Sequence, residues 1–227
     1  MTTGARGAFE LHIGFPSTQS DVAKNVGGCS PCRWKLTSIL PPHNLRPKRF
    51  ATHDVPSGAG IIATVAFDRL DAVVEVVFAC ADKFASLPWV RIEVEQILIA
   101  DPADPDAPSL STADTALLLA LRESMRGRLL DAPPFESHFS VFDKTPTPDF
   151  SLDLVVELVR KIDLPADQAL QVKGVNKVIL TSFYDTQREA LVQTANTARA
   201  LERELAATAP NLSLKVVSER VLFCASP

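Results

Sequence analysis

Two short stretches of the sequence place a histidine two positions after a glutamate. Glu10 precedes His12 near the N-terminus, and Glu136 precedes His138 in the second half of the chain. A histidine close to a carboxylate can be tuned as a general acid or base near neutral pH. The same groups can instead satisfy one another in a polar network that serves the fold without chemistry.

Further polar side chains are expected beside these motifs, because successive residues of a strand point to opposite faces of a sheet. On a strand predicted at 9–15 the alternate apolar residues are assigned to the helices, which leaves Glu10 and His12 on the helix-free face. The same alternation adds Glu95 and Glu219 from two later strands, and Ser140 after His138. We predict that this face carries the binding residues Glu10, Arg91, Glu93, Glu136 and Lys215.

Two histidines in equivalent units resemble the two-histidine phosphoesterases, in which each lobe offers a His-x-Thr or His-x-Ser motif to a cyclic phosphate. The run His138-Phe139-Ser140-Val141 matches this motif over four residues, whereas His12 is followed two positions later by Gly14, which has no hydroxyl. The resemblance implies a hydrolase of a small phosphodiester or cyclic phosphate, with His12 and His138 as acid and base and Ser140 beside them.

The favoured hypothesis is a non-catalytic binding or assembly protein that uses its helix-free sheet faces. A protein partner or a small anionic ligand would suit such a surface, and the oligomeric state stays open. We expect no cofactor and no metal. Cys29-Ser30-Pro31-Cys32 resembles a thioredoxin active-site turn over four residues only, and zinc would need two further ligands there, so two ordinary cysteines in a turn are expected.

Three segments of the first half recur in the same order in the second half. Residues 9–13 resemble 135–139, residues 61–68 resemble 178–185, and residues 90–98 resemble 214–222, with a glutamate shared at Glu95 and Glu219. Each half then reads β-α-β-β-α-β, the ferredoxin-like order. The sequence therefore predicts an α+β fold, an internal duplication of two ferredoxin-like βαββαβ units joined by a linker helix.

Hydrophobic periodicity and β-branched content set the expected elements. Strands are predicted at about 9–15, 34–40, 61–67, 90–99, 135–142, 169–172, 177–184 and 213–224. Helices are predicted near 20–27, 68–87, 112–130, 151–162 and 186–208. Helical spacing assigns Phe78 and Leu129 to the packed sides of the second and third of these, and Leu191, Ala195, Ala198, Leu201 and Leu205 to the apolar stripe of the last. The expected domains are a first unit over 1–100, a Pro/Asp spacer and linker helix over 101–131, and a second unit over 132–227. The loop 41–60 carries the basic residues Arg46, Lys48 and Arg49, which we expect to be solvated.

Composition narrows the class of protein further. The chain of 227 residues has a formal net charge of -4, which argues against a nucleic-acid partner because phosphate binding depends on many Lys and Arg side chains. No apolar run approaches the roughly 20 residues of a membrane span. No secretory signal is visible, so a cytoplasmic location is expected.

Overall fold

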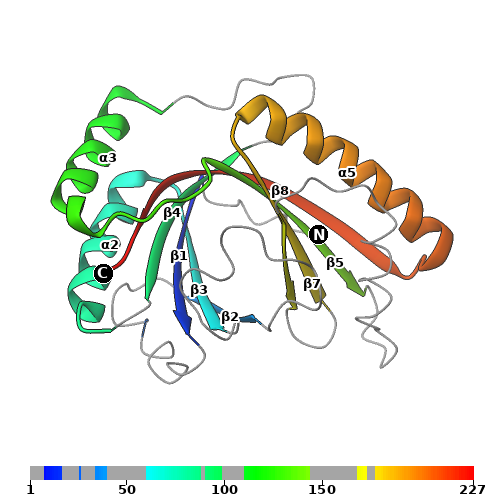
Figure 1. Ribbon diagram of the computed structural model, residues 1–227, viewed down its shortest axis with the longest axis horizontal. Coiled ribbons are helices and arrows are strands. Elements are labelled where there is room, and N and C mark those ends of the chain that lie inside the picture. The colour runs from blue at the N-terminus through cyan, green and yellow to red at the C-terminus, as the bar shows by residue number, and fades with distance from the viewer. Residues whose placement is uncertain are drawn as a thin grey trace.

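The structure, a computed structural model, describes residues 8–16, 26, 34–39, 60–87, 90–98, 110–143, 168–172 and 177–227. It is α+β, with one antiparallel sheet and helices outside it (Figure 1). The strands are β1 (Phe9–Pro16), β2 (Lys35–Ile39), β3 (Gly60–Phe67), β4 (Arg91–Leu98), β5 (Phe135–Asp143), β6 (Gln168–Val172), β7 (Lys177–Tyr184) and β8 (Leu212–Ala225). The described α-helices are α2 (Leu70–Phe84), α3 (Thr112–Ser124) and α5 (Gln187–Thr208).

The strands follow the order β2-β3-β1-β4-β8-β5-β7-β6. Within each half of the chain, the fourth strand pairs with the first, the first with the third, and the third with the second. The two halves meet where β4 pairs antiparallel with β8 at the centre of the sheet. The fourth strands of both halves therefore form the centre of the molecule.

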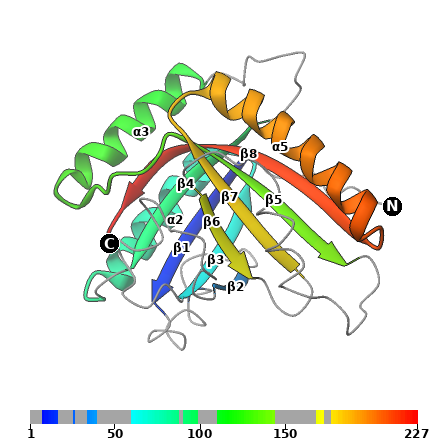
Figure 2. The same ribbon diagram turned by 45° about the vertical axis from the view of Figure 1, so that its right-hand side comes forward.

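The sheet is strongly curved, and the helices lie on its outer side (Figures 1 and 2). Helix α2 contacts β1, β3 and β4, whereas α5 contacts β5, β7 and β8. The two edge strands, β2 and β6, approach each other, with Cα atoms within 8 Å. The face that these helices leave uncovered is therefore the inner, concave face.

An apolar core fills the space between α2, α3 and the first half of the sheet. Leu11 and Ile13 of β1 and Ile92 and Val94 of β4 are fully buried in it. Their neighbours along each strand must point to the opposite face. The phase predicted for these two strands is thus confirmed, and Glu10 and His12 lie on the concave face.

Hydroxyl groups take part in the packing beneath α5. The buried Ser137 of β5 bonds to Thr194 of α5, with 2.6 Å between their oxygens, and to Ser218 of β8, with 3.0 Å. Each hydroxyl can donate one bond and accept others, so the three groups satisfy one another without water. The buried side of α5 is therefore less apolar than predicted, because Thr194 and Thr197 occupy buried positions on it.

Two helices are shorter than predicted, since α2 covers Leu70–Phe84 instead of 68–87 and α3 ends early. The helix expected over 112–130 ends at Ser124, and a short 3-10 turn, Arg126–Arg128, follows it. Leu129, assigned to the packed side, is consequently 38% exposed, because it lies beyond the helix. Phe78 of α2 is likewise 41% exposed, and Val73 and Val76 are among the buried residues of that helix.

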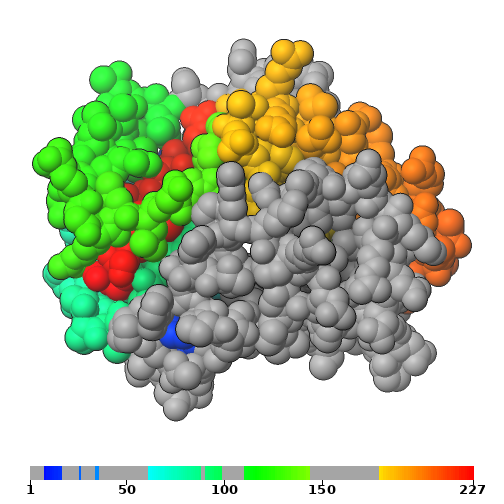
Figure 3. Space-filling model, in the orientation of Figure 1, coloured from blue at the N-terminus to red at the C-terminus, as the bar shows by residue number. Residues whose placement is uncertain are grey.

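A β-bulge interrupts the junction of the two halves. Val94 pairs with Phe223 and Glu95 with Val221, so Leu222 is an extra residue on β8. Its carbonyl oxygen accepts a hydrogen bond from Nη2 of Arg122 on α3, over 2.7 Å. Beyond the bulge, Phe223 is fully buried in the apolar core. Figure 3 shows part of β8, in red, at the surface between α3 and α5.

Replacing Arg122 with methionine is expected to lower the free energy of unfolding by about 1–3 kcal/mol, because the bulge carbonyl loses a charged donor. Denaturant unfolding measures this change. Arg126→Met is the matched control, since Arg126 pairs only with the exposed Glu123 and should change stability by less than about 1 kcal/mol. Equal effects of the two substitutions would contradict a special role for Arg122.

Several predictions fall on residues that the structure does not describe. These are the helices near 20–27 and 151–162, apart from residue 26, the Cys29 and Cys32 turn, the spacer 101–108, and the basic loop with Arg46, Lys48 and Arg49.

Candidate functional site

His138 lies between two carboxylates on the concave face. Its Nε2 atom is 3.0 Å from Oε1 of Glu136, two positions earlier on β5, and 2.8 Å from Oε2 of Glu219 on β8. Its Nδ1 atom is 2.8 Å from the hydroxyl of Thr181 on β7. Three adjacent strands therefore fix both ring nitrogens.

His12 has the same surroundings in the first half. Its Nε2 atom is 3.4 Å from Oε2 of Glu10 and 2.9 Å from Oε2 of Glu95 on β4. Its Nδ1 atom is 3.0 Å from the hydroxyl of Thr64 on β3. The pattern of one histidine, two glutamates and one threonine thus occurs twice.

Strand register accounts for this repetition. In the first half Glu10 is paired with Glu95 and His12 with Thr64. In the second half Glu136 is paired with Glu219 and His138 with Thr181. Residues paired across neighbouring antiparallel strands share a face, so each set gathers around its histidine. Sequence reasoning placed all four glutamates on this face but selected only Glu10 and Glu136 as binding residues.

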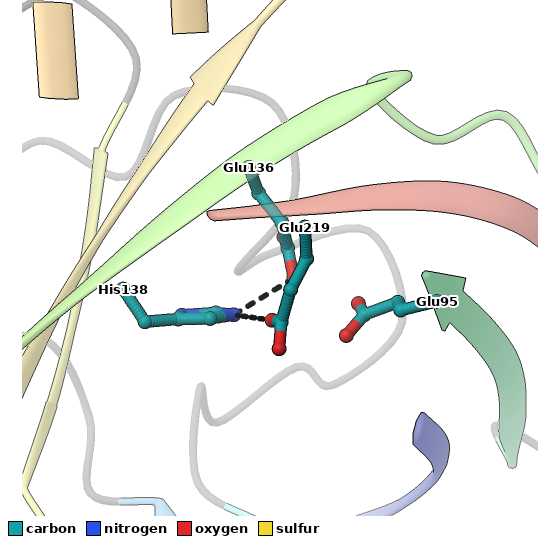
Figure 4. A group of neighbouring side chains, drawn as sticks. All are labelled: Glu95, Glu136, His138 and Glu219. Carbon is teal, nitrogen blue, oxygen red and sulfur yellow. Dashed lines mark hydrogen bonds and ion pairs between the residues drawn. The ribbon is translucent and has the colours of Figure 1, made fainter. Parts of the chain in front are cut away.

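The two sets meet at the junction of β4 and β8. One ligand atom each from Glu95, Glu136, His138 and Glu219 lie within 4.8 Å of one another. Figure 4 shows the side chains of Glu136 and Glu219 beside the ring of His138, with the carboxylate of Glu95 directed toward them from the other side. These four side chains come from three different strands, and we call them the junction cluster.

The sequence by itself offers no relative to compare. No protein-family model matches it, and no curated protein matches it. No helix among the described residues is both long and apolar enough to cross a membrane. The site must therefore be interpreted from its own chemistry.

Acidic groups outnumber basic groups around the junction cluster. Five buried carboxyl groups lie on this face, those of Glu10, Glu93, Glu95, Glu136 and Glu219. Arg91 offsets one of them, because its Nη2 atom is 2.5 Å from Oε1 of Glu93. Among the described residues, the two histidines are the basic groups closest to the remaining four, so this part of the face favours positive charge.

Shifts in pKa oppose this excess of negative charge. Burial and the charges of Glu136 and Glu219 raise the pKa of Glu95 well above its usual range, which favours the protonated form of this carboxyl group. Burial opposes a charge on His138, but Glu136 and Glu219 raise its pKa well above the usual value. Burial would also raise the pKa of Glu136, yet the charge and hydrogen bond of His138 lower it to about 2.

Some ligand atoms in the site lack a hydrogen bond despite their burial. Oε2 of Glu95, Oε2 of Glu219 and Nε2 of His12 are buried and have no hydrogen-bond partner. The close approach of Glu219 to His138 and of Glu95 to His12 is therefore an ion-pair contact without hydrogen-bond alignment. A cation bound by these oxygen and nitrogen atoms would replace the ion-pair contacts with direct coordination.

The remaining predicted residues occupy the periphery of the site. Ser140 is buried opposite Lys215, and the Lys215 side chain is exposed. Arg91 is the cross-strand partner of Gly14 and belongs to the pair with Glu93. The structure brings Glu10, Glu136 and the two histidines together, but it places Lys215 toward solvent.

Both histidines are oriented as metal ligands commonly are. A ligating histidine usually donates its other ring N–H to an oxygen, which fixes the tautomer and directs the free nitrogen lone pair at the ion. The hydroxyls of Thr64 and Thr181 can accept such a bond from Nδ1. Atoms bound to one ion at about 2.0–2.2 Å and at right angles lie about 3 Å apart. The nitrogen–oxygen distances at His138, 2.8 and 3.0 Å, match that separation.

Proposed function

We propose that the protein binds a divalent metal ion at the junction cluster of Glu95, Glu136, His138 and Glu219. The observation that supports this most is the convergence of one imidazole and three buried carboxylates, with ligand atoms within 4.8 Å of one another. The proposal retains the hypothesis of a binding protein that uses its helix-free face, and it names the ligand as a cation. It replaces the expectation that no metal is bound.

The donor set favours a transition metal of intermediate hardness. Carboxylates suit Mg²⁺, Ca²⁺ and Mn²⁺, whereas imidazole suits Zn²⁺ and Fe²⁺. Three oxygen donors with one nitrogen donor therefore favour Mn²⁺, Fe²⁺ or Zn²⁺ over Mg²⁺. The buried cysteine Cys224 is the cross-strand partner of Glu93 and is not a member of the junction cluster.

The phosphoesterase hypothesis receives less support from the geometry. Nε2 of each histidine faces two carboxylates, so an anionic phosphate would enter a face with excess negative charge. A small anionic ligand fits this face better once a cation is bound. A protein partner and a cytoplasmic location stay predictions.

We also infer that the two halves are copies of one ferredoxin-like unit. The same order of fourth, first, third and second strand supports this, as does the repeated register of Glu, His and Thr. The helix α3 would then belong to the connection between the units. In this arrangement the cluster lies where the fourth strands of the two units pair.

Equilibrium dialysis of metal-free protein against Mn²⁺ or Zn²⁺, followed by elemental analysis, tests the metal proposal. We expect the wild-type protein to retain metal and Glu219→Gln to bind at least about 100-fold more weakly, because a ligand charge is lost without loss of volume. Glu202→Gln on the exposed side of α5 is the matched control and should bind like the wild type. Wild-type protein that retains neither ion would refute the proposal.

A further inference from the structure

Glu95 faces both histidines of the concave face. Its Oε2 atom is 2.9 Å from Nε2 of His12, and the same side chain belongs to the junction cluster with His138. Glu219 is its equivalent in the second half by register, and it contacts His138 while its charge also acts on His12. Each of these two glutamates is therefore placed between the two histidine sites.

The first-half site repeats the contact geometry of the junction cluster. Nε2 of His12 and Oε2 of Glu95 are both buried and form an ion-pair contact over 2.9 Å that lacks hydrogen-bond alignment. Nδ1 of His12 is within hydrogen-bond distance of Thr64, so Nε2 is the ring nitrogen that faces Glu10 and Glu95. A second cation would replace these contacts and be shared by the three side chains.

We propose that the concave face holds two divalent ions in a dinuclear centre. His12 and Glu10 are the terminal ligands of one ion, His138 and Glu136 are the terminal ligands of the other, and Glu95 and Glu219 bridge them. The inference rests on the proposed metal-binding function and extends it. It assigns a ligand role to every group of the repeated pattern except the two threonines, which orient the histidines.

The donor atoms on this face are sufficient for two ions. Arg91 and Glu93 pair with each other, which leaves four other carboxylates around the two histidines. Each carboxylate offers two oxygen atoms, and each histidine offers one ring nitrogen. Bridging carboxylates hold paired ions about 3.5–4 Å apart in dinuclear enzymes.

Metal stoichiometry separates this inference from the proposed function. Metal-free wild-type protein is titrated with Mn²⁺, and bound metal is measured by elemental analysis. Electron paramagnetic resonance reports whether bound ions are magnetically coupled. We expect two ions per chain with a coupled signal at saturation. One ion with the signal of isolated Mn²⁺ would overturn the inference and keep the proposed function, whereas no bound ion would overturn both.

Two matched substitutions locate the second ion. His12→Gln and His138→Gln each remove one terminal ligand, so each variant should bind one ion and lose the coupled signal. Thermal unfolding of the metal-free variants shows whether they are folded. If His12→Gln still binds two coupled ions, the first-half position is wrong. If the wild type binds two ions without magnetic coupling, the ions lie apart from each other, which would also contradict a shared centre.

Discussion

Saturating metal-free protein with Mn²⁺ is expected to raise its free energy of unfolding by about 4 kcal/mol when the free ion is about a thousand times its Kd. The physical reason is that the ligand set exists only in the folded chain, where the four strands β1, β4, β5 and β8 bring the residues together. For a protein of this size the melting temperature should rise by roughly 10 °C. Differential scanning calorimetry of the two forms measures the shift.

The control is the variant Glu219→Gln, in which Mn²⁺ should leave the melting temperature nearly unchanged. Mg²⁺ at the same concentration should give a smaller shift than Mn²⁺, because imidazole is a poor ligand for Mg²⁺. An unchanged melting temperature of the wild type on addition of Mn²⁺ would show that the carboxylates and histidines satisfy one another without a metal.

Replacing Glu95 with glutamine should abolish the binding of both ions and leave the stability of the metal-free protein nearly unchanged. The loss is double because Glu95 faces both histidines. Stability is spared because glutamine has nearly the shape of glutamate, and because burial and the neighbouring charges of Glu136 and Glu219 raise the pKa of Glu95 and so disfavour its ionised form. Elemental analysis and denaturant unfolding give the two readouts.

Glu93→Gln, on the same strand, should have the opposite effects on stability and on metal binding. This substitution breaks the pair with Arg91, so it should lower the free energy of unfolding on the order of 1–3 kcal/mol and leave two ions bound. A stability loss at Glu95 as large as that at Glu93, together with retained metal, would mean that Glu95 serves the fold alone.

Local patterns were sufficient to predict the strands and the face on which Glu10 and His12 lie. Strand alternation depends only on neighbours along the chain, and the buried Leu11 and Ile13 set the phase of β1 without ambiguity. The same reasoning failed at Phe78 and Leu129, where α3 covers only part of α2 and the helix ends before Leu129. The periodicity of a helix predicts which side of it is apolar, but not how much of that side a neighbouring element covers.

The centre of the site could not be found by such reasoning. Glu95 and Glu219 were assigned to the helix-free face, but their importance depends on the pairing of β4 with β8. That pairing joins segments more than a hundred residues apart, and neither strand carries a local signal for its partner. Lys215 was placed beside Ser140 by strand alternation and adjacency, and the two residues do pair, yet its place farther along β8 leaves its side chain exposed.

The extra residue Leu222 constrains what insertions and deletions β8 can accept. Before it, Glu219 faces the cluster of acids, and after it Phe223 enters the apolar core. Glu219 and Phe223 are four positions apart and would share one face in a regular strand, so the bulge is what keeps the aromatic ring away from the carboxylates. Deletion of Leu222 would remove the bulge and leave both residues on their present faces. Among related chains, a strand that is one residue shorter between Glu219 and Phe223 should therefore lack the bulge and still keep the acid and the aromatic ring on opposite faces.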